Sequence, residues 1–189
     1  MTSLDILNTI FVKNDKEAFD VVHQHLVSQG EKSFIYQTDC AYRGKNDEDQ
    51  NDVDNEDKED FVWRYNGKSC AVGCLIKNEY YHENIELTPA SNDHILGILE
   101  DSHPEWEINS DSVIMLEVLQ KIHDGIFAYN WEIALTVARK LFFEDNIIVR
   151  AKTDEYELLF DPNYHVKDIP TFIWNEIKSQ ATALTNWKV

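Results

Sequence analysis

The stretch NSDSVIMLEVLQKIHDG (residues 109–125), followed closely by NWEIALTVARKLFFED (residues 130–145), decides the expected fold of this chain. In the first segment, Ser110 or Asp111 is placed to cap a helix and Gly125 to end it. In the second, apolar residues recur at helical spacing and predict a buried stripe of Trp131, Ala134, Leu135, Ala138, Leu141 and Phe142. The short link between the segments predicts an antiparallel helix pair.

An amphipathic pattern also fills residues 13–30. Asn14 is placed to cap this helix, Glu17 to complete a capping box three residues later, and Gly30 to end it. The pattern predicts a buried stripe that consists of Ala18, Phe19, Val22, Leu26 and Val27.

Two further segments predict helices. Residues 91–101 form a short helical pattern, and residues 169–187 form a closing one that begins at Pro170 or Thr171. With the segments above, this gives a total of about five to six helices.

Other segments are rich in β-branched and aromatic residues and predict strands. Residues 32–44 form one extended segment, and residues 61–70 form another that contains an Asn66–Gly67 turn. Residues 146–160 predict two strands joined near Thr153 and Asp154.

These elements together predict an α+β fold, in which small antiparallel β-hairpin elements pack with the helices. The expected organisation is a single compact domain over residues 1–189, with a C-terminal β-hairpin and helix (146–189) as an appendage. Residues 45–60 are almost uninterrupted acid and amide, which predicts an inserted, solvated loop. Within it, Asp47, Asp49 and Asn51 match the start of an EF-hand, but Asp52 stands where that motif needs glycine, so no metal site is predicted.

The composition limits the possible classes of function. The chain of 189 residues has a formal net charge of −18, so its field repels phosphate backbones and anionic membranes and attracts basic proteins. No apolar run approaches the ~20 residues that cross a bilayer, and the start lacks the pattern of a signal peptide. We therefore expect a cytoplasmic protein with a basic protein partner, without direct nucleic-acid or membrane binding. The 3 cysteines are too few for a disulfide framework and are expected to be free thiols.

The segment KSCAVGCLI (residues 68–76) holds the main chemical candidate. If Ser69 caps a helix here, Cys70 lies in its first turn, where the helix dipole favours the thiolate. A cysteine nucleophile also needs a histidine base and a group that orients it, and His123 with the adjacent Asp124 meets this need. The alternative is that Cys70 and Cys74 are simply packed in a small core helix. Zinc-type ligand pairs and phosphate-binding glycine motifs are absent from the sequence, so no cofactor is predicted.

Three segments carry a resemblance to a known group. CAYRG (40–44), GKSCAVGCLIKNEYY (67–81) and LEVLQKIHDG (116–125) resemble a group of small uncharacterised phage and bacterial proteins. The chain departs from that pattern in its acidic loop, at Lys77 where a proline is expected, and after residue 145. The resemblance implies no activity and no functional residues, but it favours a phage-encoded accessory or host-directed factor.

Two hypotheses of function follow from these observations. The first is an acidic interaction protein, such as a phage-encoded accessory or host-directed factor, that binds a basic partner through its charge and aromatic surface. The second is a cysteine-dependent hydrolase or transferase in which Cys70 is the nucleophile, His123 the base and Asp124 the orienting group.

Overall fold

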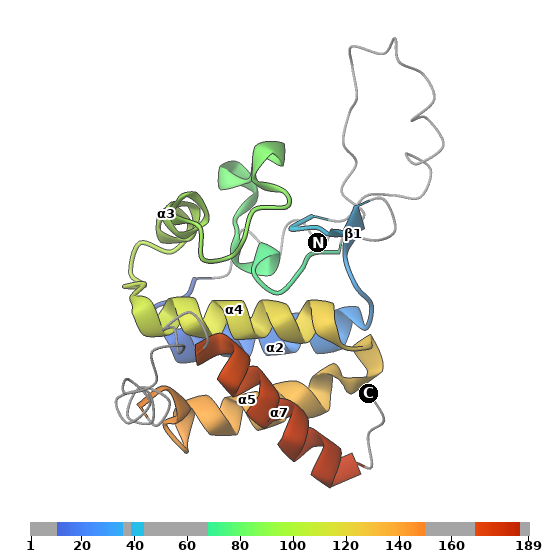
Figure 1. Ribbon diagram of the computed structural model, residues 1–189. Coiled ribbons are helices and arrows are strands. Elements are labelled where there is room, and N and C mark those ends of the chain that lie inside the picture. Colours follow the sequence, from blue (N-terminus) through green and yellow to red (C-terminus); the bar gives the residue numbers. More distant parts are fainter. Residues whose placement is uncertain (1–10, 36–38, 44–67, 150–168, 186–189) are drawn as a thin grey trace, which may run out of the picture.

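Four long helices contain most of the hydrophobic core in the computed structural model, which describes residues 11–35, 39–43, 68–149 and 169–185 (Figure 1). Helices α4 and α5 follow one another through the short helix η5 and pack together, α2 packs on both, and α7 lies across α4 and α5. The bounds of these elements are α2 Asp15–Gln29, α4 Ser110–Gly125, η5 Ala128–Asn130, α5 Trp131–Phe143 and α7 Ile169–Thr185.

Helix α2 begins and ends at the residues that the sequence predicts. The Asn14 side chain accepts a hydrogen bond from the Glu17 amide (3.0 Å), and the Glu17 carboxylate accepts one from the Lys13 amide (2.9 Å). At the other end Gly30 takes a left-handed conformation (φ 67°) that suits glycine, and its N–H bonds to Leu26 O (3.0 Å). Four of the five predicted core residues of α2 are buried, whereas Val27 is exposed.

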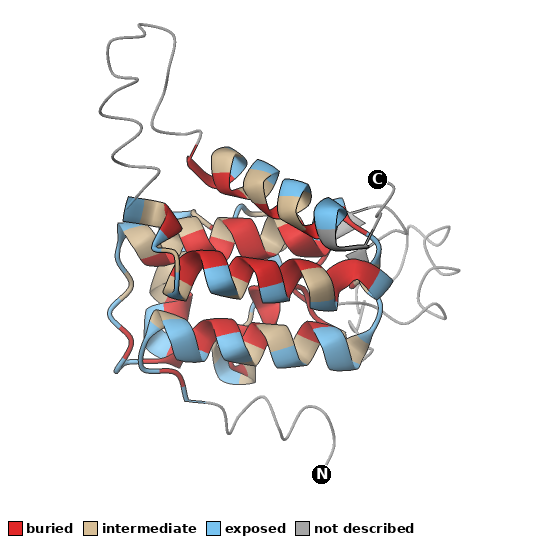
Figure 2. Cartoon of the chain, turned by 90° about the horizontal axis from the view of Figure 1, so that it is seen from below, coloured by how far each residue is buried: buried red, intermediate tan, exposed pale blue. Residues whose placement is uncertain are grey.

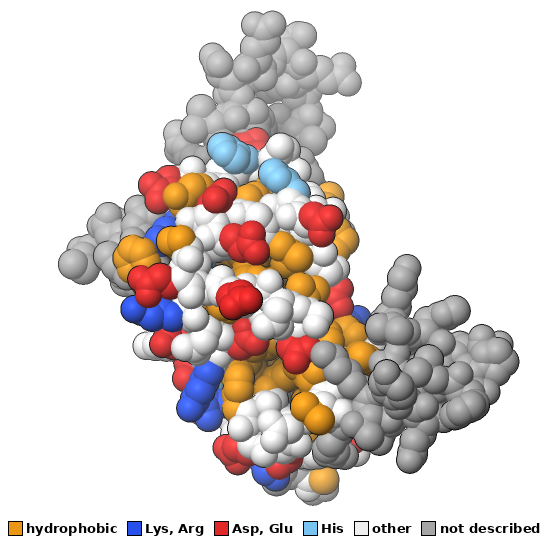
Figure 3. All heavy atoms as spheres, turned by 90° about the vertical axis from the view of Figure 1, so that its left-hand side faces the viewer, with side chains coloured by type: hydrophobic (Ala, Val, Ile, Leu, Met, Phe, Trp, Pro, Cys, Tyr) orange, Lys and Arg blue, Asp and Glu red, His pale blue; other side chains and the backbone are white. Residues whose placement is uncertain are grey.

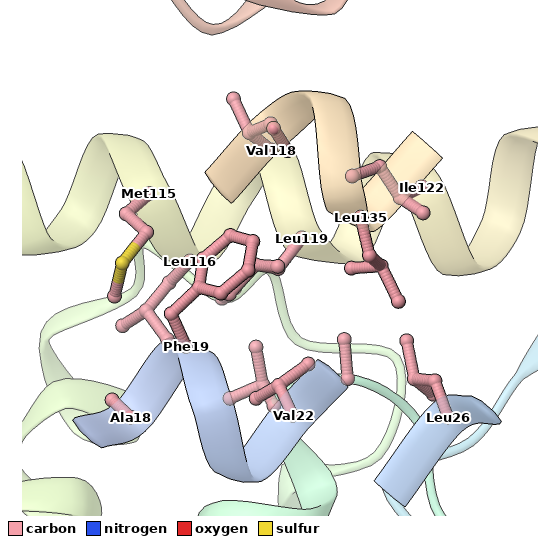
Figure 4. Packing of buried hydrophobic residues seen from close by; sticks show 14 of the residues in the cluster. Ala18, Phe19, Val22, Leu26, Met115, Leu116, Val118, Leu119, Ile122 and Leu135 are labelled. Atoms are coloured by element: carbon pink, nitrogen blue, oxygen red, sulfur yellow. The ribbon is translucent and has the colours of Figure 1, made fainter. Parts of the chain in front are cut away.

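The interface of α2, α4 and α5 forms the centre of the core. Figure 4 shows Phe19 and Val22 of α2 facing Leu116 and Leu119 of α4, and Leu26 of α2 facing Leu135 of α5. The whole predicted stripe of α5 is buried, and buried residues on these helices lie where the helices face one another (Figure 2). The cap of α4 is Asn109, one residue before the predicted position, and it forms a capping box with Ser112.

A second layer covers α4 on the side away from α5 and α7 (Figure 1). It consists of α3 Asp93–Ser102 and three short 3₁₀ helices, η2 Gly73–Leu75, η3 Asn78–Tyr80 and η4 Glu83–Ile85. The described β structure is one antiparallel pair of two-residue strands, β1 Phe34–Ile35 and β2 Asp39–Cys40.

The predicted α+β fold is therefore wrong, and the described part of the chain is helical. Residues 147–149, predicted to begin a strand, are helical, and Ile147 is buried in the helical core. β-branched residues favour strands only where a pleated surface surrounds them, and here the neighbours are helices. Of the described residues in the predicted extended segment 32–44, those in strands are the two of β1 and the two of β2.

Several predictions lie outside the described residues. These are the acidic loop 45–60, most of the segment 61–70 and the turn near Thr153. The division into one domain with an appendage at 146–189 stays a prediction.

Candidate functional site

The segment around Cys70 is held to α2 by a set of polar contacts. The Ser69 amide donates to Gln29 Oε1 (2.9 Å), and Gln29 Nε2 donates to Ser69 O (3.1 Å), so one side chain satisfies both backbone groups of Ser69. His25 Nε2 lies 3.0 Å from Ser69 Oγ and 3.1 Å from Ser69 O. Burial lowers the pKa of His25, and the bond to Ser69 O acts in the opposite direction.

The predicted helix beginning at Ser69 is replaced by a tighter turn. Because the Ser69 side chain lies against His25, it does not cap a helix; instead Cys70 Sγ accepts the Gly73 amide (3.3 Å). The only helical residues in this segment are the three of η2. Cys70 therefore does not lie in the first turn of an α-helix, and the expected dipole effect on its thiol does not apply.

Both cysteines of this turn are packed in the interior. Cys70 and Cys74 are each 2% exposed. Cys74 Sγ donates to Ala71 O (3.2 Å), and burial raises the pKa of the Cys74 thiol strongly. Within the described residues, Cys70 Sγ makes no hydrogen bond to a histidine.

His123 and Asp124 do form the expected pair at the end of α4. His123 is fully buried, and its Nδ1 lies 2.7 Å from Asp124 Oδ1. A carboxylate accepts, so Nδ1 carries the proton, and Nε2 is left to accept the Ser33 amide at 3.4 Å. The ring also stacks on Trp131, with centroids 5.1 Å apart. The lone pair that a general base would offer to Cys70 is thus directed at a backbone amide.

A buried arginine and a half-buried glutamate lie beside this segment, and the sequence analysis did not single out either as a site residue. Glu86 accepts the amides of Tyr42 (2.7 Å) and Arg43 (3.0 Å) and the hydroxyl of Tyr81 (2.6 Å). Arg43, 5% exposed, donates to Ile76 O. Burial raises the pKa of Glu86, although the three hydrogen bonds and the charge of Arg43 act to lower it. Arg43 lies in the CAYRG segment of the resemblance, but no spacing rule connects it to Glu86.

A different feature, the acidic face, covers the outer layer of the molecule. Residues 78–120 hold no Lys or Arg, so the formal charges that this segment contributes at neutral pH are all negative. The exposed carboxylates that define the acidic face are those of Glu79, Glu83, Asp93, Glu100, Asp101, Glu105 and Glu107. Figure 3 shows carboxylates spread over this side of the molecule, with Lys and Arg at its edges. One ion pair is formed here by Lys13 and Glu105 (2.9 Å).

No three His, Cys, Asp or Glu side chains in the described ranges are grouped so that they could hold a metal ion. None of the helices in the described part of the chain is long and apolar enough to span a bilayer.

No protein-family model matches this chain, and no curated protein or solved structure is significantly similar to it.

Proposed function

We propose that this chain is an acidic interaction protein that binds a basic protein partner in the cytoplasm, or in the host cytoplasm if it is phage-encoded. The observation that supports this function most directly is the acidic face, where 43 consecutive residues (78–120) contain no Lys or Arg. Carboxylates gathered in a stretch of chain without Lys or Arg raise the local negative potential, which increases the rate of encounter with a basic surface.

The arrangement of basic residues agrees with this proposal. Lys77, just before the acidic segment, is 8% exposed, and its ammonium lies 3.8 Å from the centre of the Phe11 ring. Arg43 is buried as well. Two cations that could offset the acidic face are thus withdrawn from its surface.

The test is affinity capture from a lysate of a bacterial host at about 50 mM and about 500 mM salt, with captured proteins identified by mass spectrometry. Since exposed charges are screened over about 10 Å at 0.1 M ionic strength, a basic partner is expected at low salt and is lost at high salt. The variant Glu100→Gln/Asp101→Asn/Glu107→Gln should weaken capture at low salt, because it removes three charges from the acidic face.

The matched control is Glu132→Gln/Glu144→Gln/Glu176→Gln, which removes the same charge from α5, its C-terminal end and α7. If only the total charge mattered, both variants would lose the partner equally. Recovery of one partner at both salt concentrations, and with both variants, would contradict an electrostatic interface.

A cysteine-dependent hydrolase or transferase is the second candidate, because His123 and Asp124 form a carboxylate-oriented imidazole. The burial of Cys70 and the engagement of both His123 nitrogens weigh against it. The Cys70, His123 and Asp124 assignment stays a prediction, and its test is given in the Discussion.

A further inference from the structure

A cavity of about 210 Å³ opens where the first turns of α2 and α4 meet the end of α5. Met115, Phe142 and Phe143 line its apolar part. Asp15, Asp111 and Asn146 line its polar part. Hydrophobic side chains are gathered near the carboxylates on the same side of the molecule that carries the acidic face (Figure 3).

The polar groups of this cavity are held by the fold. Asp15 Oδ1 accepts the Trp106 indole N–H (2.8 Å), which fixes the carboxylate at the start of α2. Asp111 lies in the first turn of α4, and its amide bonds to the capping Asn109 (2.8 Å). Asn146 turns the chain after α5 with a φ of 49°. The aromatic wall is equally fixed, because Phe142 and Phe143 both pack on Phe19, with centroids 6.2 and 5.5 Å apart.

The aromatic wall and the two carboxylates together limit which chemical groups can occupy the cavity. A neutral apolar group would desolvate the two carboxylates without adding a hydrogen bond or an opposite charge to either. An anion would be repelled. A long cationic side chain has the required chemistry, since it buries an apolar stem and keeps its charge beside the carboxylates. Arginine suits the cavity better than lysine, because its planar guanidinium is weakly hydrated, stacks on aromatic rings and bonds carboxylates through several donors.

We propose that this cavity receives an arginine side chain of the basic partner. The proposal rests on the function proposed above and gives it a specific anchor, because an aromatic-lined pocket that holds arginine is typical of interface hot spots. Among the described residues, the lining includes two carboxylates and no Lys or Arg, so its charge is complementary to that of a cationic occupant.

The chain offers a direct reporter of the cavity. It has only 2 methionines, Met1 and Met115, and Met115 lines the cavity. With methyl-¹³C-methionine, the full chain should give two methyl signals. Addition of N-acetyl-arginine N-methylamide should shift the Met115 signal in a saturable way, with a dissociation constant on the order of 1 mM, and leave Met1 unchanged. The citrulline analogue has nearly the same shape without the charge and should bind at least about tenfold more weakly.

Charge variants distinguish binding of arginine in the cavity from its general attraction to the negatively charged protein. Asp111→Asn should weaken arginine binding about fivefold, whereas Asp93→Asn, which removes a first-turn carboxylate of α3 outside the cavity, should change it less than about twofold. The Met115 signal itself reports whether each variant is folded.

The proposal is overturned if Met115 does not respond to arginine, if citrulline binds equally, or if both variants lose affinity equally. Failure of this pocket would leave the salt-dependent capture of a basic partner unaffected, so the two proposals are tested separately.

Discussion

Two buried histidines, His103 and His123, each make hydrogen bonds through both ring nitrogens. His103 Nε2 lies 2.7 Å from Leu75 O and therefore carries the proton, while Nδ1 accepts the Val12 amide (3.3 Å). Both ring nitrogens of His123 are also hydrogen-bonded, Nδ1 to Asp124 and Nε2 to the Ser33 amide. The pairing of His123 with Asp124 was predictable because the residues are adjacent. The contact with Ser33 was not, because it joins positions 90 residues apart.

The reactivity of Cys70 is the test of the enzyme hypothesis at this scale. We expect iodoacetamide to modify neither Cys70 nor Cys74 in the folded protein between pH 5 and 9, because both sulfurs are 2% exposed, and to modify both after unfolding. Site assignment by mass spectrometry separates these from the third cysteine.

Selective native modification of Cys70, with an apparent pKa well below the ~8.5 of a free thiol, would instead support the nucleophile. In that case His123→Gln should slow the modification, while the fold, followed by circular dichroism, is retained. A structural role for His123 would not affect the pH profile of Cys70 in this way.

At the scale of elements, the sequence predicted the helices well because their evidence is local. The caps of α2, the stripe of α5 and the position of α3 depend on residues within a few turns of one another. The turn at 70–76 was predicted wrongly because its conformation depends on distant groups. Gln29 and His25 hold Ser69 from α2, and the chain at Tyr42 lies against Gly73.

The close packing of Gly73 against the backbone of Tyr42 predicts that this turn tolerates no side chain at position 73 without a loss of stability. A Cβ at position 73 would lie 2.1 Å from Tyr42 O, a backbone atom that cannot turn away as a side chain would. Gly73→Ala should therefore lower the free energy of unfolding by at least about 2 kcal/mol. Gly97→Ala in α3 is the matched control: a Cβ there meets nothing within 4 Å, so the variant should be more stable by about 0.5–1 kcal/mol. Urea denaturation of both variants measures this, and equal stabilities would show that the turn relaxes without cost.

At the scale of the whole molecule, the sequence predicts the acidic charge but not the acidic face or the cavity. The net charge of −18 is evident from the composition. Its concentration on the face formed by residues 78–120 depends on the packing of α3 and the 3₁₀ helices in one layer, which the sequence does not show. The cavity near Met115 was not predictable, because its lining comes from α2, α4, α5 and the turn that follows α5. No local sequence pattern specifies that these helix ends lie next to one another.

Histidines that are buried or half-buried make the stability of the whole molecule depend on pH. Burial lowers the pKa of His23, His25 and His103 below the ordinary value of 6.5. As the pH falls through about 6.5, the unfolded chain takes up protons on these residues before the folded protein does. The free energy of unfolding should therefore decrease from pH 7 towards pH 5. Burial raises the pKa of Glu86, so its contribution has the opposite sign and begins just above its ordinary value of 4.5.

His103 allows this linkage to be tested on one residue. Protonation of Nδ1 would place a new N–H against the Val12 amide, which is already a donor, so the folded state resists it. His103→Asn should be less stable than the parent at pH 7 but should lose less stability between pH 7 and pH 5, because one linked proton is removed. Urea unfolding of the parent and of His103→Asn at several pH values measures this slope, and an unchanged slope in His103→Asn would show that His103 is not one of the groups that link stability to pH.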